Sequence, residues 1–282
     1  MGVKKEMKNK LNEYAKLIAK IFGAQRVYNN QSILDYLQCD MFKDGLRRGL
    51  YDEVNKVINS QNEDDKDKYK GCFICENGCK TSRKDVPFWI NNLDNKIMII
   101  AQDPGEYAYE EHKEQGIKNG LATPFAADLF LMDRNEEYIW YKYLCSKERG
   151  LGLDIEDLYI TDISKCYRGE PINCIKYLKE ELCIVRPRII VAMGRKALKA
   201  LKKIVIEKLN DSISSLHGKL KEYTFYCEGG LIKIPVLFML HPSNNGNGSW
   251  KKVLKLKVEK NFKSEKEKEL RSLGEIIRNA MK

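Results

Sequence analysis

Short apolar runs alternate with helical segments in the second half of the chain. Four such runs are KIMIIA (96–101), LYITDI (158–163), RIIVAM (188–193) and PVLFML (235–240). Between them, residues 173–185 and 194–209 space their apolar side chains at three and four, as amphipathic helices do. Continuous apolar strands separated by helices predict a mostly parallel sheet covered on both faces. The expected fold class is α/β, a three-layer α/β/α domain with a central, mostly parallel four-stranded sheet.

Helical extensions are expected on both sides of this domain. Residues 11–22 and 49–59 have helical spacing, and the charged stretch 60–71 is typical of a surface linker. The basic residues 251–282 predict a helix whose Val, Leu and Ile stripe packs on the core, with a DNA-binding element as the alternative. We expect the N-terminal arm to be an appendage. The predicted parts are the helical N-terminal extension with its linker (1–70), the α/β core (71–250) and the basic C-terminal helix (251–282).

Composition and charge indicate the cellular compartment and the class of binding partner that we expect. No apolar run reaches the roughly 18 residues of a membrane span, and the N-terminus has no signal-peptide pattern, so we expect a cytoplasmic protein. We also expect a monomer. The net charge of +10 favours a polyanionic partner such as nucleic acid, although codon bias or a hot habitat also produces lysine-rich chains. In a reducing compartment, nine cysteines indicate metal or cluster ligands rather than a disulfide framework.

Polar clusters follow three of the four apolar runs, where α/β domains collect their sites. Asp103 and His241 stand at two of these strand ends and can face each other across one crevice. A carboxylate opposite a hydrogen-bond donor suits hydrolysis of an N-glycosidic bond. The carboxylate stabilises the oxocarbenium-like sugar or orients water, and the donor stabilises the departing base anion. The three clusters are AQDPG (101–105), TDISKC (161–166) and HPSNNG (241–246).

These motifs, in this order, resemble those of the uracil-DNA glycosylase superfamily over about residues 71–250. AQDPG is similar to the first active-site motif and MLHPSNNG to the second, and RPRIIVAMGRKALKAL resembles the strand and helix between them. The resemblance implies that Asp103 assists water or the sugar cation and that His241 stabilises the leaving base. It also implies that Gln102 helps to hold the base or water, and that Phe125 of TPFAADLF stacks on the extruded base.

The cysteines resemble the pattern of the iron–sulfur (family 4) branch. The resemblance implies a structural [4Fe–4S] cluster, for which a C-x-x-C pair and two distant cysteines supply four thiolates. Zn²⁺ is the alternative occupant of such a set. The implied ligands are Cys72, Cys75, Cys166 and Cys183. Cys79 and Cys174 lie close to these ligands in sequence and leave the assignment within the set open. The core or surface is the expected place of Cys39, Cys145 and Cys227.

Asp162 departs from the family pattern, because members that excise uracil carry Asn at this position. An amide donates and accepts hydrogen bonds, whereas an ionised carboxylate only accepts. A carboxylate can accept from the exocyclic amine of cytosine and, when protonated, can donate to its ring nitrogen. We therefore hypothesise that the substrate is a cytosine-like or modified base rather than uracil. The alternatives are that Asp162 points away or that the alignment slips by a residue.

The loop after HPS is a second departure, because it is polar where uracil excisers place an apolar wedge. We expect Ser243, Asn244 and Asn245 to approach DNA phosphates. Trp250 is either the wedge or an anchor for the terminal helix. A polar loop also suits single-stranded DNA or a wedge supplied by the N-terminal arm.

The sequence therefore predicts a monofunctional DNA glycosylase that flips a base, uracil or a cytosine-like or modified one, and leaves an abasic site. AQDPG and HPSNNG contain no lysine that could form a Schiff base. One alternative is a glycosylase that attacks modified cytosines of phage DNA in antiviral defence. Another is a catalytically inactive nucleic-acid-binding protein with the same fold.

Overall fold

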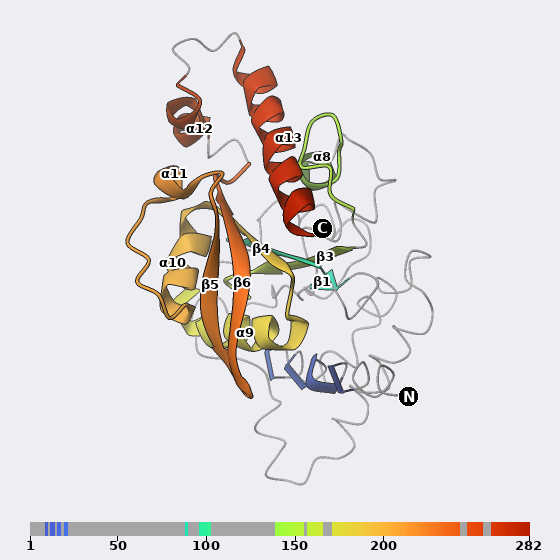
Figure 1. Cartoon of the computed structure of the whole chain (residues 1–282), viewed down its shortest axis with the longest axis vertical. Helices are drawn as coiled ribbons and strands as arrows, with labels where there is room; N and C mark the ends of the chain where they lie inside the picture. The colour runs from blue at the N-terminus through green and yellow to red at the C-terminus, as the bar shows by residue number, and fades with distance from the viewer. Residues whose placement is uncertain are drawn as a thin grey trace, which may run out of the picture.

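Six strands form one sheet within the part of the chain that the computed structural model describes (Figure 1). That part comprises portions of 9–21 and residues 88–89, 96–102, 139–154, 157–165, 171–242, 247–255 and 261–282. The strands are β1 (Phe88–Trp89), β2 (Ile97–Ala101), β3 (Leu158–Asp162), β4 (Ile189–Met193), β5 (Leu220–Cys227) and β6 (Gly230–Met239). The helices are α8 (Ile139–Leu144), α9 (Pro171–Val185), α10 (Gly194–Ile204), α11 (Ile213–Leu216), α12 (Asn247–Val253) and α13 (Phe262–Ala280).

The four predicted strands form the parallel centre of the sheet. Strands β3, β2, β4 and β6 are neighbours in that order, and each adjacent pair is parallel. Every residue of β2, β3 and β4 is buried, as expected for strands covered on both faces. In Figure 1, helices α9 and α13 lie on opposite sides of β3 and β4. The predicted α/β class with a mostly parallel sheet is confirmed.

The sheet is larger than the predicted four strands, because antiparallel strands extend both edges. Strand β1 pairs with β3, and β5 forms a hairpin with β6. The burial of β5 alternates over its second half, where Tyr223, Phe225 and Cys227 are buried and the residues between them are more exposed. A half-buried strand of this kind lacks the continuous apolar run by which the central strands were predicted.

Helices α9 and α10 lie where the apolar spacing predicted them, but α10 ends early. Its last residue is Ile204, although the predicted segment continued to residue 209. Val205 has extended backbone angles and forms an antiparallel bridge with Phe225 of β5. A tertiary contact with the edge strand therefore ends a helix that the periodicity alone would continue.

The described part of the N-terminal arm is helical and belongs to the core. Tyr14, Leu17 and Ile21 are buried, and the Tyr14 ring packs edge-on against Tyr159 of β3 at a centroid distance of 6.3 Å. The expectation of a separate appendage is wrong for this segment. Residues 49–71 lie outside the described residues. No described helix is long and apolar enough to cross a membrane.

Among its described residues, the basic C-terminal region 251–282 holds the end of α12, which stops at Val253, and the whole of α13, instead of one continuous helix. Helix α13 buries Leu270, Leu273 and Ile277, so the predicted packing of an apolar stripe on the core is confirmed. Gly274 allows a close approach at this contact, because a Cβ atom added there would lie 1.9 Å from the carbonyl oxygen of Leu151.

Candidate active site at the carboxyl edge of the sheet

The described residues of the first and second polar clusters, 101–102 and 161–165, lie side by side at the ends of β2 and β3. Ala101 is in register with Asp162, and the N–H of Ile163 donates to the Ala101 carbonyl at 3.2 Å. The pairing continues beyond the strands, where the N–H of Ser164 donates to the carbonyl of Gln102 at 3.3 Å. Gln102 itself is half-buried. The structure therefore places the start of AQDPG beside TDISKC, while Asp103 and Phe125 lie outside the described residues.

Asp162 is the last residue of β3, and only 5% of it is exposed. Lys165 holds the end of this strand with two hydrogen bonds. Its Nζ donates to the Asp162 carbonyl at 2.6 Å and to Thr161 Oγ1 at 2.5 Å. The Asp162 carboxyl group is therefore attached to a tightly bonded strand end inside the protein, not to a surface loop.

Lys165 also forms an ion pair that is almost completely buried. Its Nζ lies 2.5 Å from Glu181 Oε1, and the two side chains are 3% and 0% exposed. Burial raises the pKa of Glu181, and the nearby Lys165 ammonium opposes that shift. Sequence reasoning did not select either residue. A signal was present, because Glu181 lies on the apolar stripe of α9 beside Leu178 and Leu182, where a carboxylate needs a cationic partner.

His241 follows β6 at the same edge, two strands away from β2, which corresponds to about 10 Å. Its side chain lies against Gly194, the residue that joins β4 to α10. Gly194 has a φ of +85°, and an added Cβ would lie 3.2 Å from the Cβ of His241. Both the backbone angle and the space therefore favour glycine. We missed Gly194 in the sequence, although a glycine directly between a strand and a helix, in IVAMGRKAL, is a usable signal.

Trp250 anchors the segment that follows His241. The indole is fully buried, and its Nε1–H donates to the carbonyl oxygen of His241 at 2.8 Å. A fully buried ring cannot enter the base stack of DNA, so the wedge interpretation is wrong and the anchor interpretation is confirmed. The predicted DNA-contacting residues Ser243, Asn244 and Asn245 lie outside the described residues.

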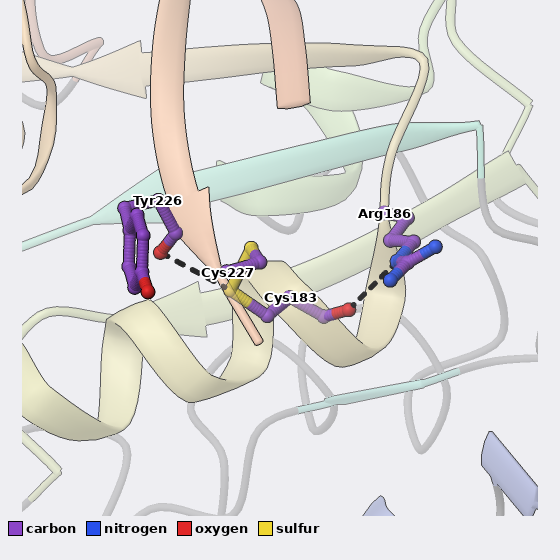
Figure 2. Close-up of a disulfide and its surroundings, with 4 residues drawn as sticks. All are labelled: Cys183, Arg186, Tyr226 and Cys227. Atoms are coloured by element: carbon purple, nitrogen blue, oxygen red, sulfur yellow. Dashed lines mark hydrogen bonds between the residues drawn. A yellow bond between two sulfur atoms is a disulfide. The ribbon is translucent and has the colours of Figure 1, made fainter. Parts of the chain in front are cut away.

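The two cysteines of α9 occupy opposite ends of the helix. Cys174, in the first turn, is buried, and its Sγ accepts from the backbone N–H of Lys165 at 3.5 Å. Cys183, in the last turn, forms a disulfide with Cys227 at the end of β5 (Figure 2). The nine intervening steps of the helix separate Cys174 from Cys183 by about 14 Å along its axis.

The disulfide corrects two expectations. Cys183 was predicted to be a cluster ligand, but a disulfide-bonded sulfur is not a thiolate and cannot bind a metal in that way. Cys227, expected in the core or at the surface, is buried and is bonded to Cys183, so a disulfide forms where the cysteine count predicted metal or cluster ligands instead. The Cys174 sulfur lies instead beside Lys165, the residue that precedes Cys166 in the sequence. Cys166, Cys72, Cys75 and Cys79 lie outside the described residues, within which no group of three potential metal ligands occurs.

The segment that contains these motifs is similar to known proteins. A model of the uracil DNA glycosylase superfamily matches residues 88–261, well over half of the chain. The chain belongs to this superfamily. The match spans strands β1 to β6 and all three strand-end clusters, so the resemblance of the motifs is confirmed at the level of the superfamily.

Three curated members of the superfamily show how far the likeness extends. The type-4 uracil-DNA glycosylase of Saccharolobus solfataricus is 30% identical over 170 residues, covering 57% of this chain and 67% of the relative. The type-4 enzyme of Thermotoga maritima is 27% identical over 172 residues, covering 57% and 78%. The type-5 uracil-DNA glycosylase of Pyrobaculum aerophilum is 29% identical over 130 residues, covering 43% of this chain but only 54% of that relative.

Proposed function

We propose that the protein is a monofunctional DNA glycosylase that hydrolyses the N-glycosidic bond of a base flipped out of DNA. The observation that supports this proposal is that Gln102, Asp162 and His241 stand at the ends of β2, β3 and β6, along the same edge of the sheet, in a member of the uracil-DNA glycosylase superfamily. The net charge of +10 supports DNA as the partner.

The proposed roles follow the charge that develops as the bond breaks. The sugar becomes cationic, and Asp103, next to Gln102 in the chain, would stabilise it or orient the attacking water. The base departs as an anion, and a hydrogen bond from His241 would stabilise it. Phe125 would stack on the flipped base, and Gln102 would hold the base or the water.

Asp162 would read the edge of the base, which supports a cytosine-like or modified substrate rather than uracil. The buried position of its carboxyl group at the end of β3 supports a fixed reading group. A carboxylate accepts from the exocyclic amine of cytosine but repels the carbonyl oxygen that uracil carries there.

Base release from defined oligonucleotides tests the function. Substrates carry uracil, cytosine or a 5-substituted cytosine, in single and double strands, and mass spectrometry identifies the freed base. We expect release by the wild type and a loss of at least about 10²-fold in Asp103→Asn and His241→Asn, with DNA binding retained. Wild-type binding to DNA without release of any base would favour the inactive binding protein instead. The comparisons do not support the antiviral role considered from the sequence.

We further propose that Cys72, Cys75, Cys166 and Cys174 are the ligands of a structural [4Fe–4S] cluster. Bound there, it would tie the segment before the core strands to the connection between β3 and α9. The buried sulfur of Cys174 next to Lys165 supports this set over the one with Cys183.

Iron and sulfide analysis of Cys174→Ser and Cys183→Ser tests the ligand set. We expect Cys174→Ser to lose the brown absorbance and the iron, while Cys183→Ser keeps both. Bound zinc in a colourless wild type would support the alternative metal. Loss of iron in Cys183→Ser alone would contradict the proposed ligands.

A further inference from the structure

Backbone groups of three successive residues, Leu240, His241 and Pro242, are held by side chains from elsewhere in the chain. The N–H of Leu240 donates to Nδ1 of His217 at 3.1 Å. The carbonyl of His241 accepts from Nε1 of Trp250 at 2.8 Å. These two bonds lie on the two sides of the His241 residue, before and after its side chain.

The third backbone group is held by a buried lysine of the C-terminal helix α13. Lys266 is 6% exposed, and its Nζ donates to the carbonyl of Pro242 at 2.5 Å. The same ammonium lies 4.9 Å from the ring centroid of Tyr143, 5.6 Å from Trp250 and 5.9 Å from Phe262. Burial lowers the pKa of Lys266 to about 8, so the group is predominantly charged at neutral pH.

The three holding side chains also contact one another through Trp250. The His217 ring lies edge-on to the Trp250 ring at a centroid distance of 5.0 Å, and the Lys266 ammonium lies 5.6 Å from the centroid of the same ring. A buried ammonium is costly unless its surroundings replace water. Aromatic faces, the Pro242 carbonyl and the side-chain oxygen of Asn247 at 3.5 Å replace it here, and the Pro242 carbonyl belongs to the His-Pro-Ser motif.

We propose that His217, Trp250 and Lys266 are positioning residues that hold the backbone of residues 240–242, and so keep the His241 imidazole in place beside Gly194. This inference rests on the role proposed for His241. A hydrogen-bond donor stabilises a leaving anion only when it is already aimed at it, and a displacement of about 1 Å can cost about 10²-fold in rate. Helix α13 therefore serves the site as well as the core.

Kinetics of conservative variants test the proposal. Trp250→Phe removes the indole donor but keeps an aromatic ring, and Lys266→Met removes the charge but keeps the stem. We expect each to lower kcat at least about tenfold with KM changed less than about twofold, because substrate binding is not the affected step. Lys266→Arg should restore part of the loss. The control is Lys263→Met, an exposed lysine on the same helix, which should leave kcat unchanged.

Double variants with His241→Asn distinguish the positioning of His241 from a general effect of the substitutions on the fold. In a His241→Asn background, Trp250→Phe and Lys266→Met should cost almost nothing further, because the group that they position is already gone. Full additivity of the losses would overturn the proposal, as would wild-type kcat in both single variants.

NMR of the imidazole rings gives a readout that does not depend on activity. The chain has three histidines, so ¹³Cε1–H signals can be assigned by replacing each with Gln. Trp250→Phe and Lys266→Met should shift or broaden the His241 signal and change its titration, whereas Lys263→Met should not. An unchanged His241 signal in folded variants overturns the positioning role. If the wild type releases no base and the signal still responds, the proposed function fails while the positioning role stands.

Discussion

At the scale of single residues, Asp162 is the side chain that we propose selects the base to be removed. The carboxyl group is buried at the end of a strand whose backbone is bonded on both sides, so an exchange to the amide changes chemistry more than shape. We expect Asp162→Asn to raise the rate of uracil release relative to cytosine-like bases by at least about tenfold. Competition between labelled oligonucleotides measures this ratio. Strong uracil release by the wild type with no change in the variant would contradict the hypothesis.

His217 predicts a pH dependence of stability. Burial lowers the pKa of its imidazole to about 4, below the roughly 6.5 of an unfolded chain. The stability that the neutral ring contributes is therefore complete above about pH 6.5, and it is lost as the pH falls towards 4, because the unfolded state then binds the proton more readily.

Urea unfolding of the wild type and of His217→Gln at pH values from 7.5 to 4.5 measures this contribution. Between pH 7.5 and pH 4.5, the free energy of unfolding of the wild type should fall by about 2 to 3 kcal/mol more than that of the variant. This figure follows from about 1.4 kcal/mol for each unit by which the pKa differs between the folded and unfolded states. Glutamine keeps an acceptor for the Leu240 N–H, so the comparison isolates the ionisation. Parallel pH profiles of the two proteins would rule out this contribution.

At the scale of elements, the buried ion pair between Lys165 and Glu181 connects the end of β3 to α9. Removing one partner leaves the other charge buried without compensation. We expect Lys165→Met to lower the free energy of unfolding by about 3 to 5 kcal/mol, measured by chemical denaturation. The double variant Lys165→Met/Glu181→Leu should recover most of the loss, because it buries no unpaired charge.

The matched control is an ion pair whose carboxylate lies on the same helix, α9. Lys20 forms a partly exposed ion pair with Glu180 at 2.9 Å, and both side chains are about a third exposed. Lys20→Met should lower the free energy of unfolding by no more than about 1 kcal/mol, because solvent screens this pair. Equal losses in Lys20→Met and Lys165→Met would show that burial does not determine the strength of the pair.

At the scale of the whole molecule, the Cys183–Cys227 disulfide joins α9 to the β5–β6 hairpin across a sequence separation of 44 residues. Closing a loop of this length lowers the conformational entropy of the unfolded chain, which raises its free energy by up to about 4 kcal/mol. Cys227→Ser should therefore lower the free energy of unfolding by about 2 to 4 kcal/mol under oxidising conditions. Cys145→Ser, outside the disulfide, is the control. If dithiothreitol changes the stability of the wild type no more than that of Cys227→Ser, the bond is not a stabilising one.

The sequence by itself determined the features that repeat locally. Continuous apolar runs predicted the four parallel strands, because strands buried on both faces need apolar side chains at every position. The polar clusters after these strands predicted one edge of the sheet as the candidate site and indicated the superfamily, because the carboxyl ends of parallel strands lie together. These inferences need only neighbouring residues and the general geometry of α/β folds.

Only the tertiary structure decided which distant residues meet. The sequence pattern implied Cys183 rather than Cys174 as a cluster ligand, but their positions at opposite ends of α9 place the Cys174 sulfur beside Lys165 and bond the Cys183 sulfur to Cys227. Likewise, no local pattern connects Lys266 with Pro242, since both the low exposure of the ammonium and its bond to that carbonyl arise from the packing of α13. The physical reason is that burial and pairing depend on contacts between segments far apart in the chain, which periodicity does not record.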